Sequence, residues 1–157
     1  MTMKMTEAPL LEDLLHRQIP TPFEADYLLG EFSIRVSTNS RDVLRHLSQV
    51  LPSVLPGPDK RIFGWRIVVE TASTAPAWRK ARYPSYFSHN GLSFLSLGRA
   101  GFVAFDCDAF SGVAFLSTEQ LDDGSILQDY ALPNLKAALT KTGSAEIHAC
   151  PSAETGL

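Results

Sequence analysis

The sequence has few cysteines, no long apolar run and no large excess of either charge, and each of these absences excludes a class of protein. Its 157 residues include two cysteines, Cys107 and Cys150, which are too few for a disulfide-stabilised scaffold. No stretch approaches the roughly 18 consecutive apolar residues of a membrane-spanning helix. A formal net charge of −3 without a basic run does not indicate nucleic-acid binding.

The composition is otherwise that of an ordinary globular protein, with 45% hydrophobic and 20% charged residues. The first residues lack the apolar core of a secretory signal, so we expect a cytoplasmic protein. The length favours one domain. We therefore expect a flexible tail over residues 1–8 and a single domain over residues 9–157.

Motifs that would reveal catalysis directly are also missing. The chain contains neither the G-x-x-x-x-G-K-[ST] phosphate loop nor the G-x-G-x-x-G dinucleotide motif. It has no C-x-x-C pair, and its four histidines (His16, His46, His89 and His148) show no metal-ligand spacing. The sequence therefore implies no cofactor and no metal.

The first half of the chain shows a β-α-β pattern. Apolar residues at helical spacing predict a helix over residues 10–19, which ends before Pro20. Alternation predicts strands over 32–36 and 63–69, with a helix over 43–51 between them. Asn39 or Ser40, just before this helix, is a good N-cap residue.

The second half is predicted to form an antiparallel meander followed by a helix. After a basic linker over residues 71–83, short strand-like runs alternate with glycine-containing turns. Asn90-Gly91 is a strong signal for a tight hairpin because both residues tolerate positive φ. A helix is predicted over residues 125–141, interrupted by Pro133, and the residues from Glu146 to Ala149 predict the start of a strand.

These elements predict an α+β fold: a mainly antiparallel sheet of about six strands with two or three helices packed on one face. We expect the core to contain Phe32, Ile34, Val36, Trp65, Ile67, Phe94, Val103, Phe105 and Leu135.

Five residues could line a ligand pocket if the fold brings them together. Asp106 and Asp108 flank Cys107 at strand spacing, which would point both carboxylates to one face, where a hard cation could bind. The alternative is that two acids at a strand end are merely solvated. Arginine side chains could bind an anion, and a histidine could act as an acid or base. The candidates are Arg66, Arg82, Asp106, Asp108 and His148.

Several segments together resemble the N-terminal region of bacterial HPr-kinase-like proteins (HPr serine kinase/phosphorylase-related). They are Phe32-Ser33-Ile34-Arg35-Val36 with Asn39-Ser40, Trp65-Arg66-Ile67-Val68, the glycine-punctuated meander, the long helix, and Ile147-His148-Ala149. The resemblance covers roughly residues 30–157. It implies a region that precedes a phosphate-loop kinase core and enters it through a strand around the His-Ala pair.

Because this chain has no phosphate loop and no acidic magnesium-binding motif, we expect no kinase activity from it alone. The resemblance implies a non-catalytic accessory, regulatory or substrate-recognition domain, with a phosphate-loop kinase domain in the same or another chain as its partner. The alternative is a stand-alone ligand-binding protein or small enzyme with a pocket near Arg66, Asp106, Asp108 and His148. A third hypothesis is a homo-oligomer in which the edge strand of the meander pairs between copies.

Overall fold

The computed structural model describes residues 19–55, 57, 61–70, 85–96, 101–121 and 124–148, with side chains up to residue 142 apart from that of Gln120. The expected tail, the expected helix apart from its last residue, and the basic linker with Arg82 lie outside the described residues.

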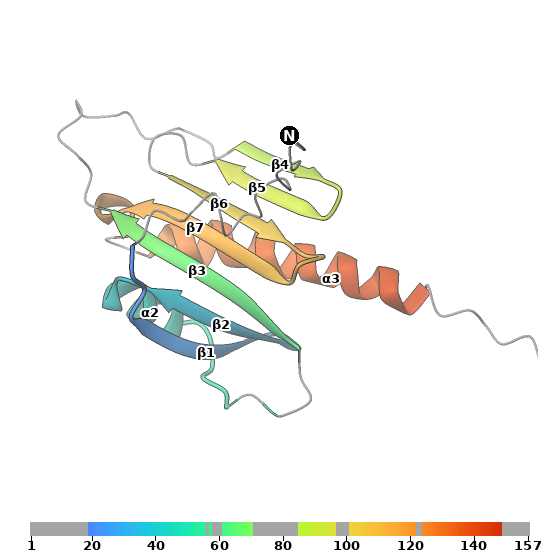
Figure 1. The fold of residues 1–157 in the computed structure, drawn as a ribbon, viewed down its shortest axis with the longest axis horizontal. Helices are drawn as coiled ribbons and strands as arrows, with labels where there is room; N and C mark the ends of the chain where they lie inside the picture. Colours follow the sequence, from blue (N-terminus) through green and yellow to red (C-terminus); the bar gives the residue numbers. More distant parts are fainter. Residues whose placement is uncertain are drawn as a thin grey trace, which may run out of the picture.

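Seven described strands form one sheet, one strand more than the sequence predicts (Figure 1). They are β1 (Phe23–Leu29), β2 (Phe32–Thr38), β3 (Ile62–Glu70), β4 (Ser85–His89), β5 (Leu92–Ser96), β6 (Gly101–Asp106) and β7 (Ser111–Ser117). Their order across the sheet is β1-β2-β3-β7-β6-β5-β4. The β2–β3 and β3–β7 pairings are parallel, and the other four pairings are antiparallel. The sheet is therefore mixed, although mostly antiparallel.

The predicted β-α-β unit is confirmed. Helix α2 (Arg41–Ser48) begins shortly after β2, and its buried residues Val43 and Leu47 share one face because they are four residues apart. β2 and β3 are direct parallel neighbours, with Val36 opposite Trp65. Parallel neighbours need a crossover connection, and this connection contains α2.

The start of α2 differs from the prediction. Ser40 occupies the N-cap position, but its side chain makes no capping hydrogen bond. The side-chain amide of Asn39 instead donates to the carbonyl oxygen of Val69 and accepts from the Val69 N–H, with both distances 2.8 Å. Asn39 therefore ties the end of β2 to the end of β3.

Strand β1 was not predicted, and its outer edge is covered. Its residues alternate between the two faces of the sheet, with Tyr27 and Leu29 buried. The backbone of residues 52–54 runs along the edge: the Leu28 N–H donates to the Pro52 carbonyl at 3.0 Å. The Val54 N–H likewise donates to the Asp26 carbonyl at 3.3 Å.

The meander is confirmed: β4, β5, β6 and β7 are successive antiparallel neighbours. The predicted tight hairpin joins β4 to β5, with φ values of 47° at Asn90 and 78° at Gly91. Positive φ at both central residues defines a type I′ turn, whose twist matches that of the flanking strands.

The last helix continues further than predicted. One turn of π-helix, η3 (Ile126–Ala131), leads into α3 (Leu132–His148). In a regular α-helix the ring of Pro133 would press on the carbonyl of Asp129, four residues earlier. The wider π turn, in which the Leu132 N–H donates to the Leu127 carbonyl, avoids that geometry. The predicted strand from Glu146 is wrong, because this segment is still helical.

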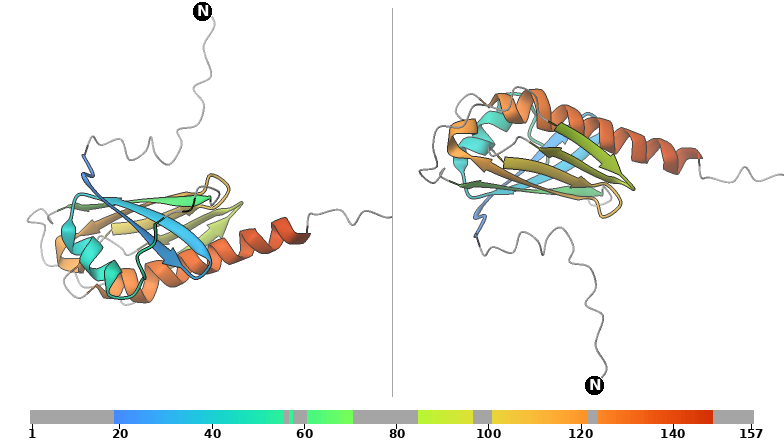
Figure 2. Two further views of the ribbon diagram at one scale, coloured as in Figure 1. Left: turned by 90° about the horizontal axis from the view of Figure 1, so that it is seen from below. Right: turned by 90° about the horizontal axis from the view of Figure 1, so that it is seen from above.

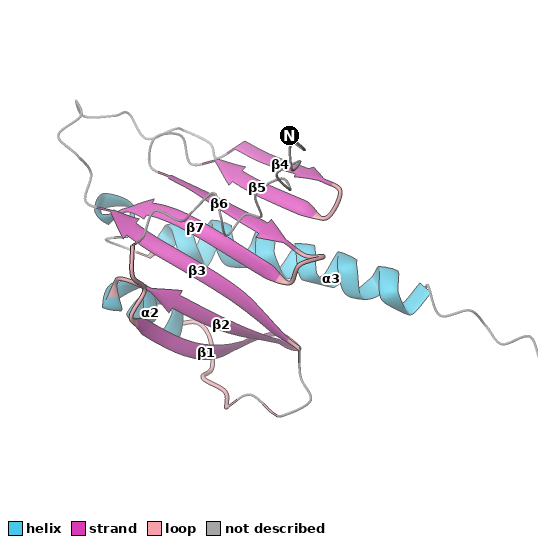
Figure 3. Ribbon diagram, viewed as in Figure 1, coloured by secondary structure: helices cyan, strands magenta, loops and turns pink. Residues whose placement is uncertain are grey.

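Both helices, α2 and α3, lie on one face of the sheet (Figures 2 and 3). The main core lies between them and the sheet and includes Leu127, Leu135 and Leu139. Seven of the nine predicted core residues are buried: Ile34, Val36, Trp65, Ile67, Val103, Phe105 and Leu135. Phe32 is half-buried against this core, whereas Phe94 is half-buried on the other face. We call that other face of the sheet the open face, because neither helix covers it.

Candidate functional site

Arg66 lies in the middle of β3 on the open face. The alternation of the strand places it there, because its neighbours Trp65 and Ile67 are buried on the helix side. One guanidinium nitrogen, Nη2, donates to the carbonyl oxygen of Ile19 at 2.6 Å. Its Nε is buried without a partner among the described residues. Arg66 therefore holds the chain before β1 against the open face.

Asp106 and Asp108 do not form the expected carboxylate pair. β6 ends at Asp106, and residues 107–110 form a turn, so the strand alternation that would align the two side chains stops between them. The Asp106 carboxylate accepts a hydrogen bond from the Ala109 N–H at 3.0 Å and so stabilises the turn. Asp108 is exposed, and its carbonyl oxygen accepts from Arg61 at 3.3 Å.

The described candidate residues do not converge on one pocket. Arg66 aligns with Val113 of β7, whereas Asp106 aligns with Ser111, so the two lie two strands and two residues apart. Strand spacing and rise put their Cα atoms about 12 Å from each other. His148 ends α3, the helix that covers the opposite face, and its side chain lies outside the described residues, as does Arg82.

A small depression at the β1 side of the sheet is lined by Asp26, Tyr27, Ser33, Ile34, Val54 and Ile62. The hydroxyl of Ser33 points to no described partner and is buried. The empty space is about 150 Å³ and includes open solvent, whereas sites for small organic ligands measure about 300–1,000 Å³. The depression is too small to serve as a substrate pocket.

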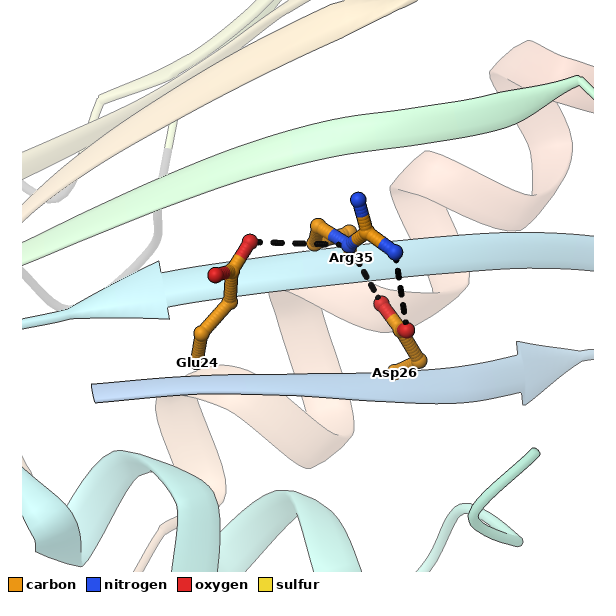
Figure 4. Close-up of polar contacts among 3 residues, drawn as sticks. All are labelled: Glu24, Asp26 and Arg35. Carbon is orange, nitrogen blue, oxygen red and sulfur yellow. Dashed lines mark hydrogen bonds and ion pairs between the residues drawn. The ribbon is translucent and has the colours of Figure 1, made fainter. Parts of the chain in front are cut away.

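An ion-pair cluster missed by the sequence analysis joins β1 to β2 beside this depression (Figure 4). The guanidinium of Arg35 donates from Nε and Nη2 to the two carboxylate oxygens of Asp26, at 2.8 and 3.1 Å. Its Nε also lies 3.5 Å from a carboxylate oxygen of Glu24. The hydrogen bond that Arg35 donates to Asp26 is the main cause that raises the pKa of Arg35 above its ordinary value. The Arg35 side chain is 42% exposed, so solvent screens the cluster, which adds only modestly to the pairing of β1 with β2.

The Cys107 thiol is not set up as a nucleophile. The residue is 2% exposed, and burial is the largest cause that raises its pKa. The charges of Asp106 and Asp108 raise the pKa further, while a hydrogen bond with Thr142 of α3 lowers it. Since the thiolate is the reactive form, a raised pKa keeps Cys107 inert at neutral pH.

The most distinctive feature of the open face is a row of aromatic rings across four strands. Phe94 and Phe102 stack with centroids 5.3 Å apart, and Phe102 and Phe115 lie 5.5 Å apart. They surround the buried Ala104 and Val113, and Phe87 extends the row to β4, where it pairs with Phe94. We call Phe87, Phe94, Phe102 and Phe115 the phenylalanine row. The meander was predicted, but the sequence gives no direct indication of which face of each strand the helices leave uncovered.

No grouping of three or more His, Cys, Asp or Glu side chains that could hold a metal ion occurs within the described residues. The helices in this part of the chain also lack the length and apolar character that a membrane span requires. Comparisons with protein-family models, with curated proteins and with solved structures found no match.

Proposed function

We propose that this chain is a non-catalytic accessory domain of the cytoplasm that recognises a protein partner through the open face of its sheet. The phenylalanine row carries this proposal. It places four large apolar side chains on the face that neither α2 nor α3 covers. Phe87 is 62% exposed. Exposed apolar patches on otherwise soluble folds commonly mark sites of protein interaction.

The rings suit a protein surface better than a small ligand. They lie side by side on a sheet instead of lining a cavity, so they present a broad and shallow contact area. Aromatic residues are enriched at protein interfaces, where they bury a large area at little cost in conformational entropy. Arg66 of β3 aligns with Val113 of β7, between the rings, and would form part of a polar rim.

The resemblance to the region before the core of HPr-kinase-like proteins suggests which partner to test first. We propose a phosphate-loop kinase domain, in the same or another chain, with this chain contributing substrate recognition or regulation. The separation of Arg66 from Asp106 supports a recognition role over catalysis, because the described acidic and basic candidates do not meet at a reacting centre.

The test is calorimetric titration of this chain with the phosphate-loop core of an HPr-kinase-like protein. We expect saturable binding and at least a tenfold loss of affinity in Phe94→Thr, which removes one ring of the row and keeps a residue that favours strands. The matched control is Tyr130→Thr, because Tyr130 is a 39%-exposed aromatic residue on η3, away from the open face.

Both variants must first show cooperative urea unfolding. Absence of binding to the kinase core at about 100 µM, a concentration at which even weak specific complexes form, would reject the proposed partner. An equal loss of affinity in Phe94→Thr and Tyr130→Thr would reject the open face as the binding surface.

A further inference from the structure

The two edges of the sheet differ in their protection. At β1, residues 52–54 bond to the Leu28 N–H and the Asp26 C=O, and Glu24 and Asp26 add charge. At β4, all five residues, Ser85 to His89, are exposed, and none is acidic, lysine, arginine or proline. Natural sheets protect their edges with charge, proline, bulges or a covering segment, and the described residues provide none of these at β4.

The hairpin geometry defines which backbone groups of β4 face outward. In a hairpin with a two-residue loop, the residues that flank the loop exchange hydrogen bonds with each other, and the next residue points its N–H and C=O away. In the β1–β2 hairpin this rule correctly assigns Asp26 and Leu28 as the outward residues. The equivalent residues before the Asn90-Gly91 turn are Tyr86 and Ser88.

We propose that β4 pairs with β4 of a second copy of this chain, in an antiparallel register centred on Phe87. In this register Tyr86 and Ser88 of one copy lie opposite Ser88 and Tyr86 of the other. Across the two copies, these residues carry four outward N–H groups and four outward C=O groups. Together the groups form four intermolecular hydrogen bonds, so each outward group of Tyr86 and Ser88 has a partner. The arrangement has the two-fold symmetry expected of a homodimer.

The side chains of β4 favour its own copy as the partner. Phe87 lies opposite its symmetry mate in a non-hydrogen-bonded pair, the closer of the two antiparallel pair types, so the two rings can pack on the open face. His89 lies opposite Ser85, so no like charges oppose one another. The contact also makes the two phenylalanine rows continuous. The dimer does not depend on the proposed kinase partner, because its contacts are formed within copies of this chain.

The proposed contact involves five residues from each copy, whereas a standard interface of about 1,200–2,000 Å² involves about 20–30 residues from each partner. We therefore expect a weak dimer and test it by sedimentation equilibrium of the full chain alone between about 10 and 500 µM. The average mass should rise towards twice that of the monomer. In Phe87→Lys two ammonium groups would oppose each other, and the dissociation constant should rise at least tenfold.

The matched control is Leu55→Lys, which exchanges an apolar side chain that is 93% exposed for the same charge away from β4. It should associate like the unmodified chain. A chain that stays monomeric throughout the concentration range overturns the proposal. So does equal association of Phe87→Lys and the unmodified chain.

A cross-linking pair tests the register and does not require Phe87→Lys to fold. In a background with Cys150→Ser, Phe87→Cys should form an intermolecular disulfide under mild oxidation, because residue 87 faces its own copy. Ser85→Cys should not, because its opposite residue is His89. Equal disulfide yields from the two variants, or none from Phe87→Cys, would overturn the register.

Discussion

Asn39 shows how one side chain can replace part of a β-ladder. Its amide makes the same pair of hydrogen bonds to Val69 that a neighbouring backbone would make. Asn39 or Ser40 was predicted to cap the following helix, because both residue types are common at N-cap positions. That role needs only local spacing, whereas the bond to Val69 joins residues 30 positions apart and cannot be inferred without the sheet pairing.

Replacement of Asn39 by alanine should lower the free energy of unfolding by about 2–3 kcal/mol, because two hydrogen bonds are lost and the Val69 groups are left without partners. Urea denaturation followed by circular dichroism measures the change. Ser40→Ala is the control and should cost less than about 0.5 kcal/mol, since the Ser40 side chain makes no capping bond. A larger loss in Ser40→Ala than in Asn39→Ala would show that capping dominates.

The Cys107 thiol should resist chemical modification in the folded protein. Fast-reacting thiols, counted with a chromogenic disulfide reagent at pH 7, should be equal in number in the unmodified chain and in Cys107→Ala. After denaturation the counts should differ by one. One fast-reacting thiol fewer in folded Cys107→Ala than in the folded unmodified chain would contradict the burial and raised pKa of this residue.

The same raised pKa predicts a pH dependence of stability. The unfolded chain releases the Cys107 proton at a lower pH than the folded protein does, so the contribution of this residue is complete below the unfolded pKa of about 8.5 and declines above it. Between pH 8 and 10 the unmodified chain should therefore lose more stability than Cys107→Ala. Parallel pH profiles for the two proteins would contradict this.

Among the larger elements, the meander was the easiest to predict, because short alternating runs and glycine turns depend on local sequence alone. β1 was missed although Ala25, Tyr27 and Leu29 alternate with polar residues for most of its length. The end of α3 was misassigned because the run of residues around Ile147 is short enough to fit either a strand or a helix. Periodicity cannot distinguish the two over so few residues.

Close contact between β6 and β7 depends on Gly101, which has a φ of 134°. A Cβ at this position would overlap the carbonyl oxygen of Phe115 on the neighbouring strand. Gly101→Ala should therefore destabilise the protein by about 2–4 kcal/mol, through strand separation and backbone strain. Thermal unfolding measures the effect.

Gly64→Ala provides the matched control for that experiment. Its added methyl group would meet no atom within 4 Å, and its φ is not in the left-handed region. We expect a change below about 0.5 kcal/mol, which is usual for a substitution at an unconstrained surface position. Glycine entropy alone would make either alanine variant more stable, so similar losses in the two variants would mean that the contact with Phe115 does not account for the effect.

On the scale of the whole molecule, the α+β class could be predicted, but the strand order could not. β7 inserts between β3 and β6, so strands more than 40 residues apart in sequence become parallel neighbours. This insertion also separates the candidate site residues. It places Arg66 in the middle of the sheet and Asp106 at the end of β6, next to the turn that leads to β7. Residue types suggested a pocket, whereas the topology distributes those residues over the surface.

The proposed accessory role predicts that neither small phosphate-containing ligands nor Mg²⁺ stabilise the molecule. Its melting temperature should change by less than about 1 °C with millimolar ATP, inorganic phosphate or Mg²⁺, because a ligand raises stability only when it binds the native state specifically. Differential scanning fluorimetry measures this. A saturable shift that disappears in Arg66→Gln would instead favour the alternative of a stand-alone ligand-binding protein.

The segment at residues 52–54 also limits how far the sheet could grow. Because residues 52–54 lie along the outer edge of β1 and bond to Leu28 and Asp26, β4 is the edge of the described sheet that has no such covering segment among the described residues. In a dimer joined through β4, both outer edges of the combined sheet would be the covered edges of β1. A third copy would then have no exposed edge strand to pair with. Association would stop at two chains rather than continue into a fibril, so the chain could keep an unguarded strand without acting as a template for open-ended cross-β assembly.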